Sequence, residues 1–207
     1  MSTQYVTKAQ LKTYLGLSGT AQDTNLDNAI NSASRQIDKF CDRRFWQDGS
    51  ATVKLYNPDS LFIATVDDIS TTTGLIVKLD TTDNGTHDTT LTLNTDYVLK
   101  PSNPTEHVVS DTTYYYPQNE IHILATRSSE RFDLKIQNNI QVTAKFGFSA
   151  VPEAISQATL IQATRLFKRK DAPFNVMGNE QTGQIELFSK FDADAKQLIT
   201  PYKLHRL

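Results

Sequence analysis

The stretch NLDNAINSASRQIDKFCDRRFW, residues 25–46, is the most informative part of the chain. Its apolar side chains recur at spacings of four and three residues, namely Leu26, Ile30, Ala33, Ile37 and Phe40. This spacing places them on one stripe of an α-helix and leaves the charged and amide side chains on the other faces. Residues 41–46 then bring charge and aromatic rings together at the end of that helix. We therefore expect an amphipathic helix whose apolar stripe lies in a core.

A shorter helix is expected before it. Thr7 and Gln10 have the spacing of a capping box, in which the Thr hydroxyl accepts a hydrogen bond from the third helical N–H and the Gln side chain reaches back to the cap. An apolar edge follows, formed by Leu11, Tyr14 and Leu15. Gly16 is a typical helix end because glycine adopts the left-handed conformation without strain. Two amphipathic helices with a short connection predict a helical hairpin over residues 1–50.

From about residue 51, apolar and polar residues alternate. The alternating apolar positions are Ala51, Val53 and Leu55; Leu75, Val77 and Leu79; Leu91 and Leu93; and Ile140, Val142, Ala144 and Phe146. Strict alternation is typical of antiparallel strands that bury one face. Turn residues such as Asn84-Gly85 interrupt the run. We interpret residues 51–148 as an antiparallel β domain inserted between helices.

Helix returns after Val151, since Pro152 suits the first helical position and Glu153 is favourable in the first turn. The apolar residues that follow are Ile155, Ala158, Leu160, Ile161, Ala163, Leu166 and Phe167. They cover more than half of the helix circumference. We therefore expect this long helix, within residues 149–172, to be buried on several sides, either in its own core or against another subunit.

Residues 173–207 are expected to form an extended C-terminal arm with one short helix. That helix is predicted over residues 193–199, because Asp192 is a good N-cap and Pro201 ends helical structure. The predicted fold class is therefore α+β: an N-terminal helical hairpin and later helices packed together, with an inserted antiparallel β domain.

Composition narrows the class of protein. With 38% hydrophobic and 21% charged residues, the chain is typical of neither a membrane protein nor a disordered one. The net charge of −2 gives no general attraction for nucleic acid or an anionic membrane. Cys41 is the only cysteine, which excludes an internal disulfide, and the first ten residues lack the apolar core of a secretion signal. We expect a cytoplasmic protein that contacts no membrane.

No catalytic arrangement is recognisable in the sequence. The four histidines, His87, His107, His122 and His205, share no metal-ligand spacing with one another. Asp67 and Asp68 are adjacent on an expected strand, so their carboxylates point to opposite faces and cannot work as an acid–base pair. The chain also lacks a glycine-rich phosphate loop and a nucleophile elbow. We predict that the protein is not an enzyme and uses no metal or cofactor.

Three features have two interpretations each. Cys41 is either a reactive thiol beside two arginines or a small apolar residue on the buried stripe of its helix. The basic cluster contacts phosphate or offsets the helix dipole at a solvated C-terminus; it comprises Arg165, Lys168, Arg169 and Lys170. The run Tyr114–Tyr116 before Pro117 is a stacking platform for bases or sugars, or a strand edge with alternating buried rings.

Five short motifs occur in one order along the chain. They are Val6–Leu15, Ile37–Phe45, Asp96–Asn103, Phe146-Gly147-Phe148 before Val151-Pro152, and the segment Asp192–Lys203. In this order the chain resembles the head-to-tail connector (adaptor, head-completion) proteins of tailed bacteriophages. Many members have Trp before the glycine of the fourth motif, so Phe146 is a mild departure.

The resemblance implies a structural virion protein in the neck of the particle, assembled in the bacterial host cytoplasm. Such proteins form a ring, commonly of twelve copies, beneath the portal, where the ring extends the DNA channel and docks the next neck or tail protein. The implied partners are the portal protein, neighbouring copies, the next neck or tail protein, and double-stranded DNA passing without sequence recognition. The implied contacts to portal or neighbour are Phe188, Phe191, Tyr202 and Leu204, and the implied channel-facing residues are Lys168, Arg169 and Lys170.

Two other classes of protein compete with this interpretation. A tail-terminator or tail-tube protein is mostly β, which the three sizeable expected helices disfavour. A monomeric carbohydrate- or ligand-binding β module with helical decoration would use the aromatic run Tyr114–Tyr116 instead and would form no ring.

Overall fold

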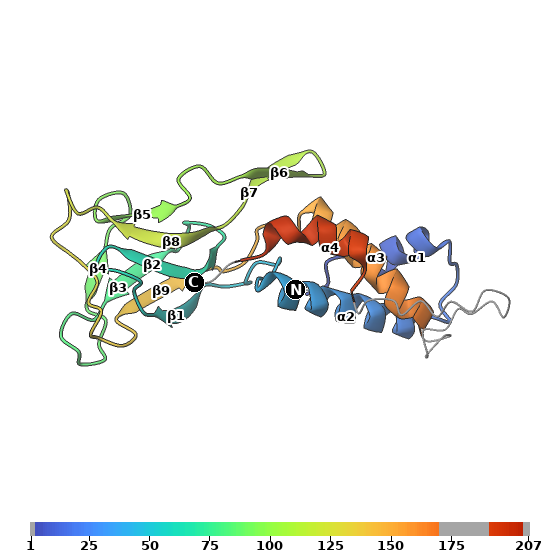
Figure 1. Ribbon diagram of the computed structural model, residues 1–207, viewed down its shortest axis with the longest axis horizontal. Coiled ribbons are helices and arrows are strands. Elements are labelled where there is room, and N and C mark those ends of the chain that lie inside the picture. Colours follow the sequence, from blue (N-terminus) through green and yellow to red (C-terminus); the bar gives the residue numbers. More distant parts are fainter. Residues whose placement is uncertain (1–2, 170–190, 205–207) are drawn as a thin grey trace. The chain divides into compact units, whose positions relative to one another are not determined.

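The computed structural model describes residues 3–169 and 191–204. The chain divides into two compact units (Figure 1). The helical unit comes from both ends of the chain, up to Phe45 and from Val151 onward, and the β unit is Trp46–Ala150. The combination of helices with antiparallel sheets confirms the predicted α+β class.

The helical unit contains helices α1 (Lys8–Leu15), α2 (Asp23–Cys41), α3 (Glu153–Arg169) and α4 (Ala193–Ile199), followed by the 3₁₀ turn η1 (Thr200–Tyr202). Helix α3 packs against all three other helices. Most of its circumference is at least half-buried, which confirms the prediction of burial on several sides. The partners that bury it include α1, α2 and α4 of the same chain.

Local capping signals set the helix ends. Thr7 accepts a hydrogen bond from Gln10 N, and the Gln10 side chain returns to the cap, which completes the predicted capping box. Gly16 ends α1 in the left-handed conformation with φ 66°. Asp192 caps α4 by accepting from Asp194 N and Ala195 N, again as predicted.

The stripe on α2 is buried as expected, with one shift at its end. Leu26, Ile30, Ala33 and Ile37 have no exposed surface, and Cys41 takes the next buried position. Phe40 is only half-buried because Cys41, four residues after Ile37, continues the stripe more directly. On α1 the expected apolar edge is also incomplete, since Tyr14 is exposed.

The β unit contains nine strands within the described residues. They are β1 (Thr52–Tyr56), β2 (Ile63–Ile69), β3 (Ile76–Leu79), β4 (Thr89–Leu91), β5 (Tyr97–Lys100), β6 (Glu106–Val109), β7 (Thr112–Tyr115), β8 (Gln118–Ile123) and β9 (Ile140–Ala144). They form a sheet of order β1-β9-β3-β4, a sheet of order β2-β8-β5, and the separate hairpin β6-β7, all antiparallel (Figure 1).

The two larger sheets contribute to one apolar core. Strand β9 shows the predicted alternation most clearly, because Ile140, Val142 and Ala144 are fully buried while the residues between them are not. Phe146 continues the buried series beyond the strand. This agreement follows from the central place of β9 between β1 and β3, where one face must be covered.

Strand β1 has the opposite orientation to the one predicted. Val53 and Leu55 face outward, with 58% and 47% of their surface exposed, so the prediction that they line a buried face is wrong. The inward positions are Lys54 and Tyr56. Lys54 Nζ lies 2.6 Å from Asp67 Oδ2 and 4.4 Å from the centre of the Phe146 ring. This ion pair and cation–π contact satisfy the lysine at the margin of the core, and the ladder with β9 sets the register of the strand.

Gly147 joins β9 to the end of the β unit at a point where no side chain fits. Its φ is +101°, and a Cβ atom there would lie 1.9 Å from the carbonyl oxygen of Trp46. Gly147 N donates to Asp68 O at 2.8 Å, which fixes the close approach of the chain segments. The motif Phe146-Gly147-Phe148 thus places two buried rings on either side of an obligatory glycine.

Candidate functional site

The outward face of the β1-β9-β3-β4 sheet carries an apolar patch. Val53 pairs with Thr143, and Thr143 pairs with Ile76 on its other side, so these three residues form one rung across the sheet. Ile76 has 44% of its surface exposed, similar to the two apolar residues of β1. Adjacent strands are about 4.8 Å apart, so the three side chains are immediate neighbours.

A second rung extends the patch and adds a charge. Leu55 pairs with Gln141, which pairs with Lys78 on β3. We call the two rungs together the outer-sheet patch; it consists of Val53, Thr143, Ile76, Leu55, Gln141 and Lys78. The patch is apolar at three positions, carries one cation and has no acidic side chain. The alternation in the sequence predicted that Val53 and Leu55 are buried and did not single out Ile76 or Lys78, because alternation does not show which face of a strand is exposed.

The β6-β7 hairpin has two different faces. His107 and Tyr114 pair across the strands and point toward the rest of the β unit, whereas Glu106, Val108, Thr113 and Tyr115 are exposed. Val108 and Tyr115 each have 53% of their surface exposed. We call these four exposed residues the hairpin face. Ser110 and Asp111 both have positive φ and make the tight turn between the strands.

The inner face of the hairpin packs into an aromatic cluster. The His107 ring is stacked on Tyr114 at 5.7 Å and lies 5.4 Å from Tyr116, while Tyr116 meets Phe148 edge-on at 5.6 Å. Burial lowers the pKa of His107 because it disfavours the charged imidazolium. Tyr114 and Tyr116 thus point inward and Tyr115 outward, which confirms the interpretation of Tyr114–Tyr116 as a strand edge with alternating buried rings.

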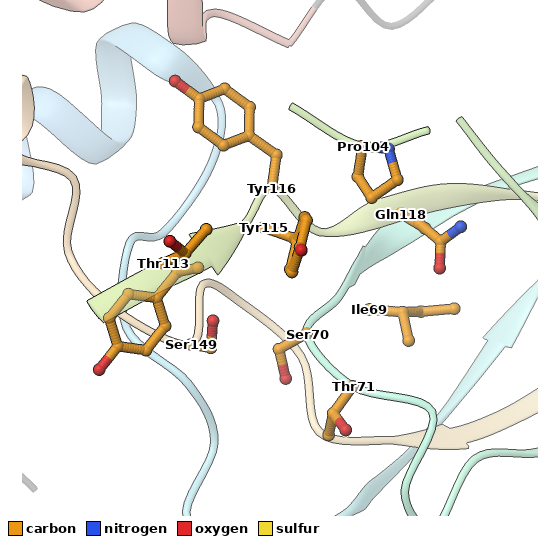
Figure 2. A pocket seen from close by; sticks show the side chains of 10 residues that line it. Ile69, Ser70, Thr71, Pro104, Thr113, Tyr115, Tyr116, Gln118 and Ser149 are labelled. Carbon is orange, nitrogen blue, oxygen red and sulfur yellow. The ribbon is translucent and has the colours of Figure 1, made fainter. Parts of the chain in front are cut away.

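A hollow of about 300 Å³ lies beside this run (Figure 2). Its lining includes Ser70, Thr71 and Gln118 as well as Tyr115. The ring of Tyr116 points away from Ser70 and Thr71 in Figure 2, in keeping with its contact with Phe148. Tyr114 and Tyr116 also line the hollow but are mostly covered, so the hollow offers a polar wall and one exposed aromatic ring, that of Tyr115.

The histidines are spread over separate places. His87 Nε2 lies 2.8 Å from Asn138 O, His122 Nε2 lies 2.7 Å from Glu120 Oε2, and His107 belongs to the aromatic cluster. His205 lies outside the described residues. Across residues 3–169 and 191–204, no group of three or more His, Cys, Asp or Glu side chains is placed to hold a metal ion. None of the described helices is long and apolar enough to cross a membrane.

Cys41 is fully buried on α2, and its Sγ lies 3.6 Å from Ile199 O of α4. Burial raises the pKa of its thiol to about 12, so the thiolate is scarce at neutral pH. The apolar-core interpretation of Cys41 is therefore confirmed. The neighbouring Arg43 lowers the pKa, but less than burial raises it.

The basic cluster lies at the end of α3. Lys168 and Arg169 are exposed, and Lys170 lies outside the described residues. Arg165 is different, because its Nη1 lies 3.8 Å from Asp192 Oδ2 and the side chain is mostly covered. The exposed charge is thus confined to the last turn, where cations also offset the helix dipole.

The predicted contact residues of the C-terminal arm lie on the helical unit itself. Phe191 stacks on Phe40 with ring centres 5.7 Å apart, and Tyr202 is buried edge-on against Phe45 at the same distance. Leu204 N donates to Cys41 O at 2.8 Å. Phe188 lies outside the described residues. The described end of the arm is therefore attached to α2 and to the segment that follows it.

The chain matches no protein-family model and no curated protein. Its fold is similar to those of solved chains from gene transfer agent particles. One belongs to the neck of an empty gene transfer agent particle computed with C6 symmetry; it has TM-score 0.53 and 15% identity, over 98% of this chain and 91% of that chain. Another belongs to the virion of a native gene transfer agent particle, with TM-score 0.50 and 16% identity over the same shares of the two chains. At this identity the comparison establishes a shared fold that includes both the helical and the β unit.

Proposed function

We propose that this protein is a structural component of a virion neck, a head-to-tail connector that forms a ring beneath the portal. The observation that carries the proposal is the extent of the fold similarity. It covers 98% of this chain and 91% of a chain in a particle neck, so it extends over both units and is not limited to one common domain. That neck was computed with sixfold symmetry, which agrees with ring assembly.

The surface chemistry of the described residues fits an assembly role. The β unit exposes apolar side chains on a sheet face and on a hairpin, and such exposed groups are typical of protein–protein contacts. In this proposal the portal and the next neck or tail protein bind the two ends of the ring. Phe188, Phe191 and Leu204 contribute to the portal or neighbour contact, and Tyr202, which is buried against Phe45, supports this part of the arm from within.

The same proposal places Lys168, Arg169 and Lys170 toward the DNA channel. Lysine and arginine contact phosphates without reading sequence, which suits DNA that passes through. The overall charge of −2 keeps the attraction weak, so that DNA is not held strongly during transit.

A monomeric ligand-binding β module is the alternative. Its best site is the hollow beside Tyr115, but Tyr114 and Tyr116 use their rings in contacts with His107 and Phe148. One exposed ring, that of Tyr115, is a weaker stacking platform than the three consecutive tyrosines in the sequence would provide. This alternative predicts a monomer that binds a sugar or a nucleotide and does not bind the portal.

Deletion and complementation test the proposed function. The gene would be inactivated in the strain that produces the particles, and heads and tails would be counted by electron microscopy. We expect DNA-filled heads without attached tails, and recovery of joined particles when purified protein is added to the extract. Intact head–tail particles from the deletion strain would contradict the proposal.

A further inference from the structure

Two groups of exposed apolar residues in the β unit form surfaces of different shape. The outer-sheet patch is a face of a four-stranded sheet, and the hairpin face is one side of a two-stranded ribbon. We propose that the outer-sheet patch of one copy receives the hairpin face of a second copy. This inference rests on the proposed function, because it names the contact through which neighbouring subunits of the ring bind one another.

The orientation of β1 is the first argument. Simple hydrophobic burial would place Val53 and Leu55 in the core and Lys54 outside, yet the strand is held in the opposite phase. A register shift of one residue would exchange the two faces of the strand, so the observed register determines that Val53 and Leu55 face outward. A strand that directs its branched apolar residues outward is suited to contact with another protein surface.

The chemistry of the two surfaces is the second argument. Val108 and Tyr115 of the hairpin face are apolar, as are the three outward residues of the patch at Val53, Leu55 and Ile76. The charges are opposite, since the patch carries Lys78 and the hairpin face carries Glu106. Pairing the patch with the patch of another copy would provide no carboxylate for either lysine, whereas pairing it with the hairpin face does.

The geometry of the contact follows from these differences. Because the two surfaces are unlike, each copy uses its patch toward one neighbour and its hairpin toward the other. Such a heterologous contact generates a ring when the rotation between copies closes. A two-fold dimer would need a self-complementary surface, whereas the patch carries only a positive charge and the hairpin face only a negative one.

Charge reversal tests the contact directly. The variants are Lys78→Glu, Glu106→Lys and the double variant, with Lys135→Glu as a control at an exposed lysine outside both surfaces. Native mass spectrometry would measure the protein concentration at which half of the chains are in rings, with the portal ring present if the wild type needs it. Each single variant should raise this concentration roughly tenfold or more, because like charges then face each other. The double variant should return to within about threefold of the wild type.

Apolar variants give a second test that does not depend on charge. The double variant Val53→Thr, Leu55→Thr removes apolar surface from the patch, and threonine is well tolerated in strands. The matched control is Leu134→Thr, which replaces an exposed leucine outside both surfaces. The patch variant should lose assembly and keep the wild-type thermal transition, while the control should assemble normally. Far-UV circular dichroism would verify that each variant is folded.

The outcomes separate this inference from the proposed function. If all the patch and hairpin variants form rings as readily as the wild type, the proposed contact is wrong and the connector role is unaffected. A wild-type protein that neither forms rings nor binds its portal would overturn both. Loss of assembly in both single charge variants without recovery in the double variant would also contradict the pairing of Lys78 with Glu106.

Discussion

At the scale of single residues, Gly147 has the strictest requirement in the β unit. Its positive φ disfavours any side chain, and the Trp46 carbonyl oxygen occupies the place of a Cβ atom. The sequence showed a glycine between two phenylalanines, but the reason for it depends on Trp46, about a hundred residues earlier in the chain. Only the folded structure brings these two positions together.

Replacing Gly147 by alanine should lower the free energy of unfolding by at least about 2 kcal/mol, because a backbone clash is added to an unfavourable φ. Gly74→Ala is the matched control, since its φ is +76° but nothing lies within 4 Å of the added methyl group. The control should cost about 1 kcal/mol. Urea unfolding measures both, and equal losses in the two variants would contradict the clash.

Cys41 should be chemically silent in the folded protein. Full burial and a thiol pKa of about 12 both suppress its reaction. At pH 8 an aromatic disulfide reagent should modify none of the native protein in minutes and one thiol per chain in denaturant. Tyr14→Cys, at an exposed position of α1, provides a rapidly reacting reference. Modification of Cys41 at the rate of this reference would show that α4 does not cover α2.

At the scale of elements, the helices were the most predictable. The cap of α1 at Thr7 and that of α4 at Asp192 depend on residues within one turn, so the sequence contains the whole signal. The β6-β7 hairpin was not recognised, because its turn residues Ser110 and Asp111 lack the Asn-Gly pattern that marks such turns. The predicted orientation of β1 was wrong because alternation shows which residues share a face but not which face the fold covers, and here the face with Lys54 and Tyr56 is the covered one.

The β6-β7 hairpin should loosen in mild acid through His107. Burial lowers the pKa of this group in the folded state, so the unfolded chain binds more protons as the pH falls below about 6.5. The contribution of neutral His107 to the free energy of unfolding is therefore complete above about pH 6.5. It is lost progressively as the pH falls from there to the lowered pKa of the folded state. The thermal transition should therefore fall between pH 7 and pH 5.

A substitution assigns this pH dependence to its group. His107→Phe keeps a ring against Tyr114 and Tyr116 but cannot be protonated, so it should flatten the curve. An unchanged slope in His107→Phe would contradict the assignment.

At the scale of the whole molecule, the fold class was predictable and the interaction surfaces only partly so. The change from helical to alternating patterns near residue 51, and back after Val151, indicated an α+β chain. Three of the implied contact residues of the arm, Phe191, Tyr202 and Leu204, were named from resemblance alone. Their packing on Phe40, Phe45 and Cys41 could not be foreseen, because it depends on how the two ends of the chain meet.

The proposed connector role predicts the mass of the assembled protein. The protein should form a ring alone or on its portal, because its fold covers that of a chain in a sixfold-averaged particle neck and its β unit exposes two unlike apolar surfaces. Assembly only in the presence of the portal would mean that the portal ring arranges the subunits and the subunit contacts then close the circle.

The most direct measurement is the mass of the complex formed by the purified full-length protein and its cognate portal ring. We expect a single complex with a fixed whole number of copies of this chain on each portal ring, and the same number in repeated preparations. A monomer of 23.2 kDa that stays free at saturating portal concentration would contradict this expectation.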